Sequence, residues 1–490
     1  MTLDRSFVIL IYLMTTTTDP SQARPLAEHG PDSPLSAEIV AWIEAEAGHP
    51  VTSVTRVAAG GRRLGFAVDL AGADSTRGLY LAMEPGDATA GDRPSGLRRE
   101  FHVYQRLARD GIRVPPVLAL HPTIDAMLME HVPGHARYGS IGDTATKVAV
   151  ARDFMACLAT AHLVDPWDDP VPGLEPHGSI RRHLTEFVDG WAERYRSGRN
   201  GPDPLLEHGL RWLRSRMPDP DRRLAIVQGD TGPGNFMFDG DRVTAIVDWE
   251  LSHLGDPFED LGWLSMRAAQ DPFPDLALRL QEYADALGEE LDLDAVRYYR
   301  VLAEWTIALI GHLKSRAGLG DSERGNAFVF EQLHRRLLIE ALAEADGETL
   351  PDLPGIRFAD TDRTWVYDMA LDQQRVSVVP HLDDPLAVRR AKGVARTLKW
   401  LKQADRAGGE PVERERQALQ ALLGTAVGDL TAARLEVVRG IREDRWSKAD
   451  QRAYLWLKTW LDNEVCGEAM GRLRDRHLDP LTQPADGGAS

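Results

Sequence analysis

The 490-residue sequence predicts an α+β protein in which a strand-rich lobe precedes a helix-rich lobe and an all-α C-terminal domain. Three observations indicate this order. From Val51 to Gly134, apolar residues recur at about every second position between glycine-bearing turns, as in antiparallel strands. From Asp143 onward the apolar spacing is helical. Helical spacing dominates again from Leu386 to His477, so we expect a bilobal domain followed by further helices.

The composition shifts predict five segments. We expect a disordered N-terminal segment over 1–34, a first lobe over 35–134 and a second lobe over 135–346. The loop-like stretch that follows predicts a linker over 347–385, and the last helical domain then covers 386–490. A cleft between two lobes is a common place for a binding site.

Two helices can be placed closely in the first lobe. Ser36 is a natural N-cap, Leu35 before it can pack onto Val40 one turn later, and Gly48 ends this first helix. The second helix is expected over Leu97 to Gly111, because apolar residues recur there at helical spacing.

Charge and cysteine content exclude several classes of function. The net charge of −18 and the pI near 5.3 argue against general binding to nucleic acid or to an anionic membrane. The two cysteines, Cys157 and Cys466, lie far apart without metal-type spacing, so we expect a reducing, cytoplasmic location. The apolar run Phe7 to Met14 is shorter than the roughly 20 residues of a spanning helix. Both a signal-peptide core and a translation start at Met14 stay open for this run.

The stretch VQGDTGPGNFMFDGDRVTAIVDWE, Val227 to Glu250, is the strongest candidate for a functional site. Apolar runs rich in β-branched residues enclose GDTGPGN, which can continue neither a helix nor a strand and therefore forms a loop. Asp230 and Asn235 have the D-x-x-x-x-N spacing of a kinase catalytic loop. Asp248 follows the next strand and adds the carboxylate that a magnesium ion requires.

These motifs resemble those of the aminoglycoside phosphotransferase and choline kinase superfamily, which has a protein-kinase-like fold. The resemblance covers about Ala37 to Leu342. Within the superfamily, the sequence is most similar to the branch related to the kinase domains that are joined to acyl-CoA dehydrogenases. The motifs are QGDTGPGNFMFDG, IVDWELSHLGDPFEDLGWL and, more weakly, AAGGRR and LRRE. The C-terminal helices are similar to an uncharacterised domain attached to such phosphotransferases, which implies no activity and leaves their protein partner unknown.

The resemblance implies roles for individual residues. Asp230 would be the catalytic aspartate, Asn235 and Asp248 the Mg2+ ligands, and Glu100 the helix carboxylate that pairs with a basic residue. The first lobe would bind ATP, and the second lobe would hold the catalytic and metal site. Where the family has histidine at the start of the catalytic loop this chain has Gln228, which can still hydrogen-bond the loop.

A second departure concerns the nucleotide. The strand GLYLAME places Ala82 where the family has the phosphate-binding lysine or arginine. We expect a relocated cation, either in the glycine turn or beside Glu100 in Arg98 or Arg99. The residues of the glycine turn that we expect to bind the nucleotide together with Glu100 are Gly60, Gly61, Arg62 and Arg63.

Four further residues near these motifs have simpler explanations. Asp256 and Asp260 are carboxylates that a second magnesium ion would suit, but Asp256 before a proline is better explained as a helix N-cap. Glu250 would face the metal or accept backbone donors. His162 is better explained as a packed or capping histidine.

The sequence thus predicts an ATP-dependent phosphotransferase that transfers the γ-phosphoryl group to the hydroxyl of a small molecule. By the resemblance, the acceptor would be a hydroxyacyl or acyl-CoA compound. Two alternatives stay open, namely an antibiotic phosphotransferase and a catalytically weak kinase-like module that binds a ligand or a protein partner. We expect neither nucleic acid nor membrane as a partner.

Overall fold

The computed structural model describes residues 35–57, 63–72, 78–84, 96–174, 178–198, 200–218, 222–315 and 324–483. The segment 1–34, which we expected to be disordered, lies outside these residues together with its apolar run. Gly60, Gly61 and Arg62 of the expected glycine turn also lie outside them.

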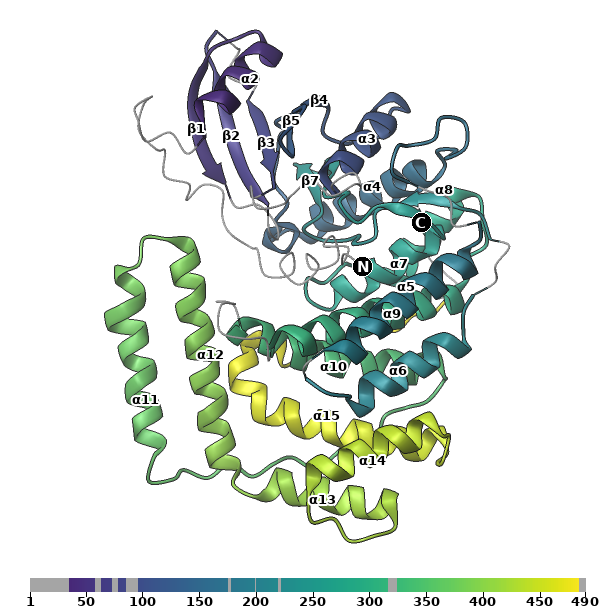
Figure 1. The fold of residues 1–490 in the computed structure, drawn as a ribbon, viewed down its shortest axis with the longest axis vertical. Helices are drawn as coiled ribbons and strands as arrows, with labels where there is room; N and C mark the ends of the chain where they lie inside the picture. The colour runs from purple at the N-terminus through teal and green to yellow at the C-terminus, as the bar shows by residue number, and fades with distance from the viewer. Residues whose placement is uncertain are drawn as a thin grey trace. The chain divides into compact units, whose positions relative to one another are not determined.

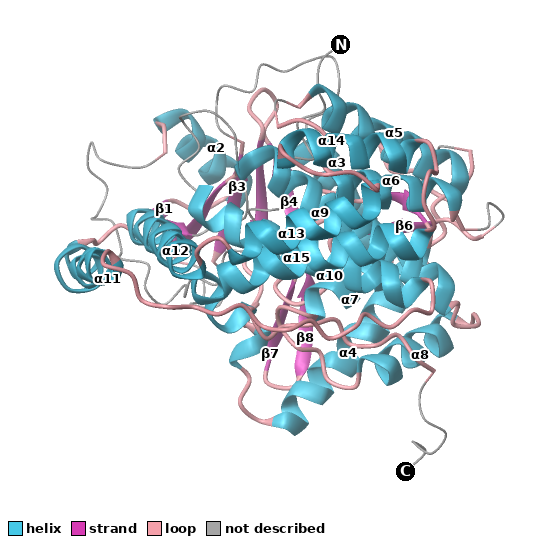
Figure 2. Ribbon diagram, turned by 90° about the horizontal axis from the view of Figure 1, so that it is seen from below, coloured by secondary structure: helices cyan, strands magenta, loops and turns pink. Residues whose placement is uncertain are grey.

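The chain forms two compact units. The first comprises Met1–Ile180, Pro220–Leu293 and Leu481–Ser490, and the second comprises Arg181–Asp219 and Asp294–Pro480. Every strand of the described residues belongs to the first unit (Figure 2). The expected strand-rich lobe is thus present.

A five-stranded antiparallel sheet forms one part of the first unit (Figure 1). The strands lie in the spatial order β1-β2-β3-β5-β4. Their bounds are β1 (Val51–Val57), β2 (Leu64–Leu70), β3 (Leu79–Met83), β4 (Val117–Leu120) and β5 (Ala126–Glu130). Helix α3 (Gly96–Arg109) connects β3 to β4 in the chain, close to the predicted bounds.

Helix α2 (Ala37–Ala47) begins and ends as predicted. The Ser36 hydroxyl oxygen accepts a hydrogen bond from the Ile39 N–H at 3.4 Å, and Gly48 ends the helix at a φ of 71°. Leu35 and Val40 both join the hydrophobic core between this helix and the sheet. The N-cap, the staple position and the terminating glycine are confirmed.

The two faces of β2 and β3 differ in the size of their side chains. One face packs against α2 and contributes the core residues Leu64, Phe66, Val68, Leu79, Leu81 and Met83. On the opposite face Gly65 pairs with Ala82, and Ala67 pairs with Tyr80, since paired residues of antiparallel strands point to the same side. Small residues therefore occupy the middle of this second face.

The rest of the first unit combines two short strand pairs with three helices. Strand β6 pairs with β9, and β7 pairs with β8, both antiparallel. The bounds are η3 (Tyr138–Ser140), α4 (Thr144–His162), β6 (Ala225–Val227), β7 (Phe236–Asp239), β8 (Arg242–Ile246), β9 (His253–Gly255), α7 (Pro257–Ala268) and α8 (Leu276–Leu287). Helix α4 packs against α8 and β8, which supports the β7–β8 hairpin from one side.

The second unit is built from helices (Figure 2). Their bounds are α5 (Ile180–Ser197), α6 (Pro204–Ser215), α9 (Leu293–Ser315), α10 (Arg324–Ala345), α11 (Thr364–Gln373), a π-helical turn (Gln374–Val378), η5 (Val379–His381), α12 (Pro385–Ala407), α13 (Glu410–Leu423), α14 (Leu430–Arg442), α15 (Lys448–Met470) and η6 (Gly471–Leu473). Helix α10 packs against α12 and α15, and α14 packs against α6. The C-terminal helices thus share a unit with helices from the middle of the chain.

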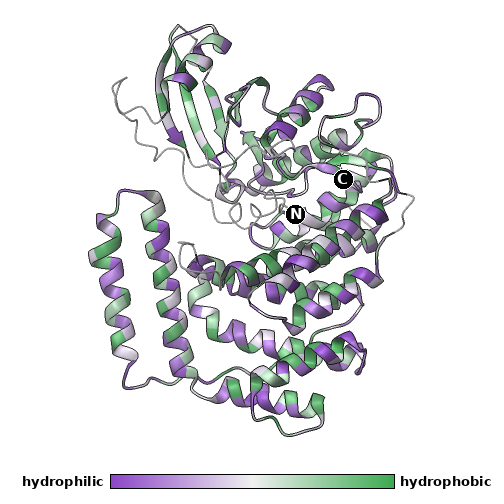
Figure 3. Cartoon of the chain, viewed as in Figure 1, coloured by the Kyte–Doolittle hydropathy of each residue, from purple (hydrophilic) through white to green (hydrophobic). Residues whose placement is uncertain are grey.

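Helix α11 lies within 347–385, where we expected a linker. It packs along α12, and both helices mix hydrophilic and hydrophobic residues along their length (Figure 3). Composition alone did not distinguish this helix from a loop. Within the described residues, none of the helices combines the length and the apolar character that crossing a bilayer demands.

Candidate active site

The loop between β6 and β7 holds Asp230 and Asn235. Gly229 adopts a φ of 81°, and a β-carbon on it would lie 2.8 Å from the backbone oxygen of Leu251. A side chain at this position would be strained both by its dihedral angle and by that contact. Glycine therefore allows the chain to turn directly before Asp230.

Asp230 is buried, and both of its carboxylate oxygens accept hydrogen bonds. Arg267 Nε donates to Oδ1 at 2.8 Å, and its Nη2 donates to Oδ2. Asn235 Nδ2 donates to Oδ2 at 3.1 Å and to the Asp230 backbone oxygen at 2.7 Å. Burial raises the pKa of Asp230, while the guanidinium opposes that rise. The structure thus brings Asp230 and Asn235 into direct contact.

Arg267 was not identified from the sequence. It lies on α7, is itself buried, and also donates from Nη1 to the Pro233 carbonyl at 3.0 Å. A charged residue within the apolar run LGWLSMRAA was the available signal, since an arginine is seldom buried without a partner. The identity of its partner depends on the tertiary structure.

Asp260 holds the backbone directly before Asp230. Its carboxylate accepts the N–H groups of Gln228 at 2.7 Å and of Gly229 at 2.9 Å, and His162 Nε2 lies 3.1 Å from Oδ2. Burial favours the neutral form, yet these hydrogen bonds lower the pKa of Asp260. Both oxygens are thereby engaged in positioning the loop, and His162 is a packed histidine as expected.

The Asp256 side chain caps helix α7. It accepts a hydrogen bond from the Phe258 N–H at 3.0 Å, and Pro257 occupies the first turn. Arg222 pairs with its second oxygen at 2.7 Å. The explanation of Asp256 as an N-cap is confirmed.

The Gln228 side chain contacts the residue before β7 and a residue after β8. Its side-chain Nε2 donates to the Val247 carbonyl and, at 3.4 Å, to the Asn235 carbonyl. The expectation that glutamine can hydrogen-bond the loop in place of histidine is confirmed. The contact also links the residues before Asp248 to the loop that holds Asp230.

Asp248 lies beside this loop because of the β7–β8 pairing. The Val247 N–H donates to the Asn235 carbonyl at 3.0 Å, one residue before Asp248. Asp248 adopts a left-handed φ of 66°, and its N–H donates to the Tyr104 hydroxyl at 2.9 Å. Burial raises the pKa of Asp248 to about 7, and the nearby Glu100 carboxylate adds to the shift.

Arg63 provides the cation that pairs with Glu100. Its Nη1 donates to Glu100 Oε2 and lies 3.2 Å from Glu250 Oε2. The other Glu100 oxygen accepts the Trp249 N–H at 3.0 Å, so α3 is tied to the segment after β8. The expected contact between Glu100 and a basic residue is therefore present, and its partner comes from the residue before β2.

The two arginines beside Glu100 have other partners. Arg98 Nε lies 3.0 Å from Asp125 Oδ1, and its Nη2 donates to the His121 carbonyl at 2.9 Å. Arg99 Nη2 donates to the Glu250 carbonyl. None of these contacts involves Glu100.

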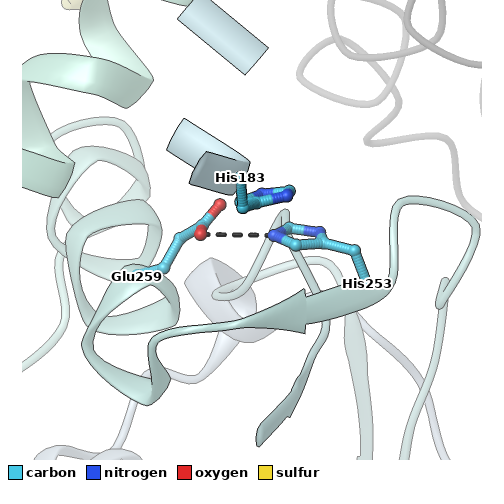
Figure 4. A group of neighbouring side chains, drawn as sticks. All are labelled: His183, His253 and Glu259. Carbon is cyan, nitrogen blue, oxygen red and sulfur yellow. Dashed lines mark hydrogen bonds and ion pairs between the residues drawn. The ribbon is translucent and has the colours of Figure 1, made fainter. Parts of the chain in front are cut away.

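A histidine–glutamate pair supports the segment between Asp248 and α7. His253 Nε2 lies 3.2 Å from Glu259 Oε2 (Figure 4), and His253 Nδ1 lies 3.0 Å from the Leu251 carbonyl. Burial opposes protonation of His253, but Glu259 raises its pKa above the usual value. The pair joins β9 to α7 and so helps to fix the backbone that leads away from Asp248.

The side chains around Asp248 fit a divalent magnesium ion. Arg63 lies among three carboxylates, those of Glu100, Asp248 and Glu250. Glu250 Oε1 is buried and has no hydrogen-bond partner among the described residues. Oxygen donors with excess negative charge are what this hard cation prefers.

Comparison with known proteins supports the interpretation of these motifs. Residues 87–305 match the phosphotransferase enzyme family model. Mouse acyl-CoA dehydrogenase family member 10 is 28% identical over 202 residues, which covers 38% of this chain and 18% of that protein. Rat family member 11 is 30% identical over 180 residues, or 35% of this chain and 23% of that protein. The chain thus spans about a fifth of the length of these relatives.

A solved structure shows the same fold. It is a crystal structure from Ralstonia eutropha of a protein assigned as an aminoglycoside phosphotransferase. The TM-score is 0.51 at 22% identity, and the match covers 64% of this chain and 98% of that one. The chain therefore has a kinase-like fold, and its residues 87–305 match the model of the phosphotransferase enzyme family.

Proposed function

We propose that the protein is a Mg-ATP-dependent small-molecule kinase that transfers the γ-phosphoryl group to a substrate hydroxyl. The observation that supports this most directly is the convergence of Asp230, Asn235 and Asp248. Asp230 and Asn235 are hydrogen-bonded, and the β7–β8 hairpin places Asp248 next to them. Phosphoryl transfer needs positioning and charge stabilisation more than covalent chemistry by the protein.

Asn235 and Asp248 would hold the magnesium ion. Bound there, magnesium would neutralise charge on the nucleotide phosphates. The Asn235 amide nitrogen donates to Asp230, so the side-chain carbonyl oxygen of Asn235 would be its ligand atom. The Glu250 oxygen without a described partner adds negative potential to the same region.

Asp230 would orient the acceptor hydroxyl and accept its proton. An ionised carboxylate offers about four lone-pair directions. Arg267 occupies two of them and Asn235 a third, which leaves one direction for a substrate hydroxyl. In this role Arg267 fixes the orientation of the carboxylate and opposes the rise in its pKa that burial causes.

For the acceptor we propose a hydroxyacyl or acyl-CoA compound. The support is the match to acyl-CoA dehydrogenase family members 10 and 11, whose names refer to acyl-CoA substrates. Those proteins are several times longer than the matched region, so the acceptor is a proposal that label transfer tests. An antibiotic is the alternative acceptor, in line with the description of the Ralstonia protein.

Calorimetric titration of ATP into the full chain, with and without magnesium, tests the nucleotide site. We expect magnesium-dependent binding that Asp248→Asn removes, while the matched variant Asp239→Asn, on an exposed strand position, retains it. Transfer of label from γ-labelled ATP to hydroxyacyl compounds, aminoglycosides and macrolides then ranks the acceptors. Transfer to an antibiotic but to no hydroxyacyl compound would reverse the order proposed here.

A catalytically weak binding module is the second candidate, and the observation that favours it is Ala82. Without a cation on β3, the phosphates lose their usual partner on this strand. This candidate predicts nucleotide or acyl-ligand binding without label transfer to any acceptor. Label transfer that Asp230→Asn abolishes would exclude it.

A further inference from the structure

The inference concerns how the nucleotide is held, and it rests on the proposed kinase function. Ala82 lies on the face of β3 that is turned away from the α2 core, directly opposite Gly65 on β2. Arg63 precedes Gly65 by two residues, so alternation along an extended strand places both on the same face. The observed contact of Arg63 with Glu100 agrees with this placement.

The paired residues of this face comprise one large side chain, Tyr80, and three small residues that leave room beside it for a long side chain. Gly65, Ala67 and Ala82 extend at most a methyl group from the sheet. The Arg63 side chain is only 10% exposed, although it comes from a residue outside the strand. A lysine at position 82 would stand diagonally next to Arg63 and would compete with it for Glu100.

Part of the Arg63 guanidinium is bonded and part of it is not. Nη1 is held by Glu100 and by Glu250, which come from α3 and from the segment after β8. Nε and Nη2 are buried, and neither has a hydrogen-bond partner among the described residues. Buried donors without partners cost free energy, so a ligand that accepts from them gains affinity.

The other candidate cations are less suited to this role. Arg98 is bound to Asp125 and to the His121 carbonyl. Arg99 donates to the Glu250 carbonyl and so supports the backbone near the site. Arg63 combines a fixed position with two donors that no described residue occupies.

The geometry points to Arg63 as the residue that binds the α- and β-phosphates of the nucleotide, with Glu100 and Glu250 as its positioning residues. The cation has moved from β3 to the start of the neighbouring strand, on the same face of the sheet. The planar fork of Nε and Nη2 is well suited to two phosphate oxygens. Nucleoside di- and triphosphates are therefore the ligand class of this subsite.

The test compares ligands that differ in their phosphates. Calorimetry of the full chain with Mg·ATP, Mg·ADP and adenosine is done on wild type, Arg63→Ala, Arg63→Lys and Arg98→Ala. We expect Arg63→Ala to lower the affinity for both nucleotides by about 10- to 100-fold, because hydrogen bonds to a charged group are lost. Adenosine affinity should stay within about twofold, because adenosine has no phosphate to contact.

Arg63→Lys covers the case in which the alanine variant does not fold. It keeps the positive charge between Glu100 and Glu250 but lacks the fork, so we expect a folded protein whose ADP affinity falls by about tenfold. Arg98→Ala removes the same charge from the same lobe and should leave all three affinities within about twofold.

The outcomes separate this inference from the proposed function. If wild type binds neither Mg·ATP nor Mg·ADP, the kinase function itself is overturned. If wild type binds both and the Arg63 variants bind them equally well, Arg63 is not the phosphate ligand and the kinase function stands. A specific phosphate contact would also be contradicted if Arg63→Ala lowered the affinities for adenosine and ADP equally. The same holds if Arg98→Ala and Arg63→Ala lowered the ADP affinity equally.

Discussion

The two aspartates of the site are surrounded by charge in opposite ways. Asp230 is matched by one arginine, Arg267, which contacts both of its carboxylate oxygens. Asp248 instead shares one arginine, Arg63, with the carboxylates of Glu100 and Glu250. The first group thus has one carboxylate for one guanidinium, whereas the second has three carboxylates for one guanidinium.

This difference agrees with the different roles that we propose for the two aspartates. A guanidinium that contacts both oxygens of one carboxylate holds it in one orientation, which suits the role that we propose for Asp230. A cluster with excess negative charge is costly to bury unless a cation joins it. The four predictions below test this contrast, from the largest expected effect to the smallest.

The largest effect is expected for Asp230→Asn. The variant keeps the shape of the side chain but removes its ability to take a proton, so we expect kcat to fall by about 1,000-fold. Affinity for Mg·ATP should stay within a few-fold, since Asp248 and Asn235 are intact. Steady-state kinetics with the best acceptor measure this, and a loss confined to KM would contradict the assigned role.

Arg267→Ala should destabilise the protein strongly. Asp230 would remain buried without its partner, which costs about 3 to 5 kcal/mol. Urea unfolding monitored by tryptophan fluorescence measures the change. In the double variant with Asp230→Asn we expect a smaller loss than the sum of the two single losses, and strict additivity would show that the two residues are not coupled.

Asp203, in the second unit, is a carboxylate paired with a single arginine and lies outside the candidate site. It therefore provides a reference for the pair of Asp230 with Arg267. Arg335 lies 3.0 Å from it, and although burial opposes ionisation, this arginine lowers the pKa of Asp203 from 3.8 to about 2. Because the folded pKa is the lower one, the stabilisation is complete above pH 3.8 and is lost as the pH falls through 2. The difference of roughly 1.8 units corresponds to about 2 kcal/mol.

Asp203→Asn isolates this charge effect. Asparagine can still cap α6 as Asp203 does, so the change removes the charge and keeps the cap. We expect the variant to be about 2 kcal/mol less stable at pH 7 and to show a flatter stability curve between pH 4 and 2. An unchanged acid limb in urea unfolding would show that the pair with Arg335 is not stabilising.

The smallest expected effect is a stabilisation, whereas the changes at Arg267 and Asp203 are expected to destabilise the protein. In a chelator, Asp248→Asn should stabilise the metal-free protein by about 1 kcal/mol, because it removes one of several like charges from a buried cluster. Asp230→Asn, by contrast, should destabilise it, since it leaves Arg267 unmatched. Thermal unfolding of both variants in EDTA compares the signs directly, and destabilisation by Asp248→Asn would mean that the cluster is balanced without a metal ion.

Much of the candidate site was predictable because its signals are local. The D-x-x-x-x-N spacing places Asp230 and Asn235 on one tight loop, where a short chain segment leaves few alternatives. The N-caps at Ser36 and Asp256 likewise depend on hydrogen bonds to residues two or three positions away. Such contacts are set by backbone geometry over a few residues, so the sequence specifies them.

Long-range contacts could not be predicted in the same way. Arg267 is 37 residues from Asp230 in the chain, and its position in an apolar run indicates burial but does not identify its partner. The sequence offered several arginines as partners for Glu100, and the register of β2 with β3 determined that Arg63 faces it. The roles that we assign to these residues remain predictions for the experiments above.

The sequence by itself determined the kinase-like fold, the order of strands and helices, and the loop that holds Asp230 and Asn235. The tertiary structure decided which charges are paired and how the helices are grouped into units. The physical reason is the range of the interactions. Turns, caps and periodicity depend on interactions over a few residues, so the local sequence specifies them. The partner of a buried charge is instead determined by the packing of segments that are distant in the chain.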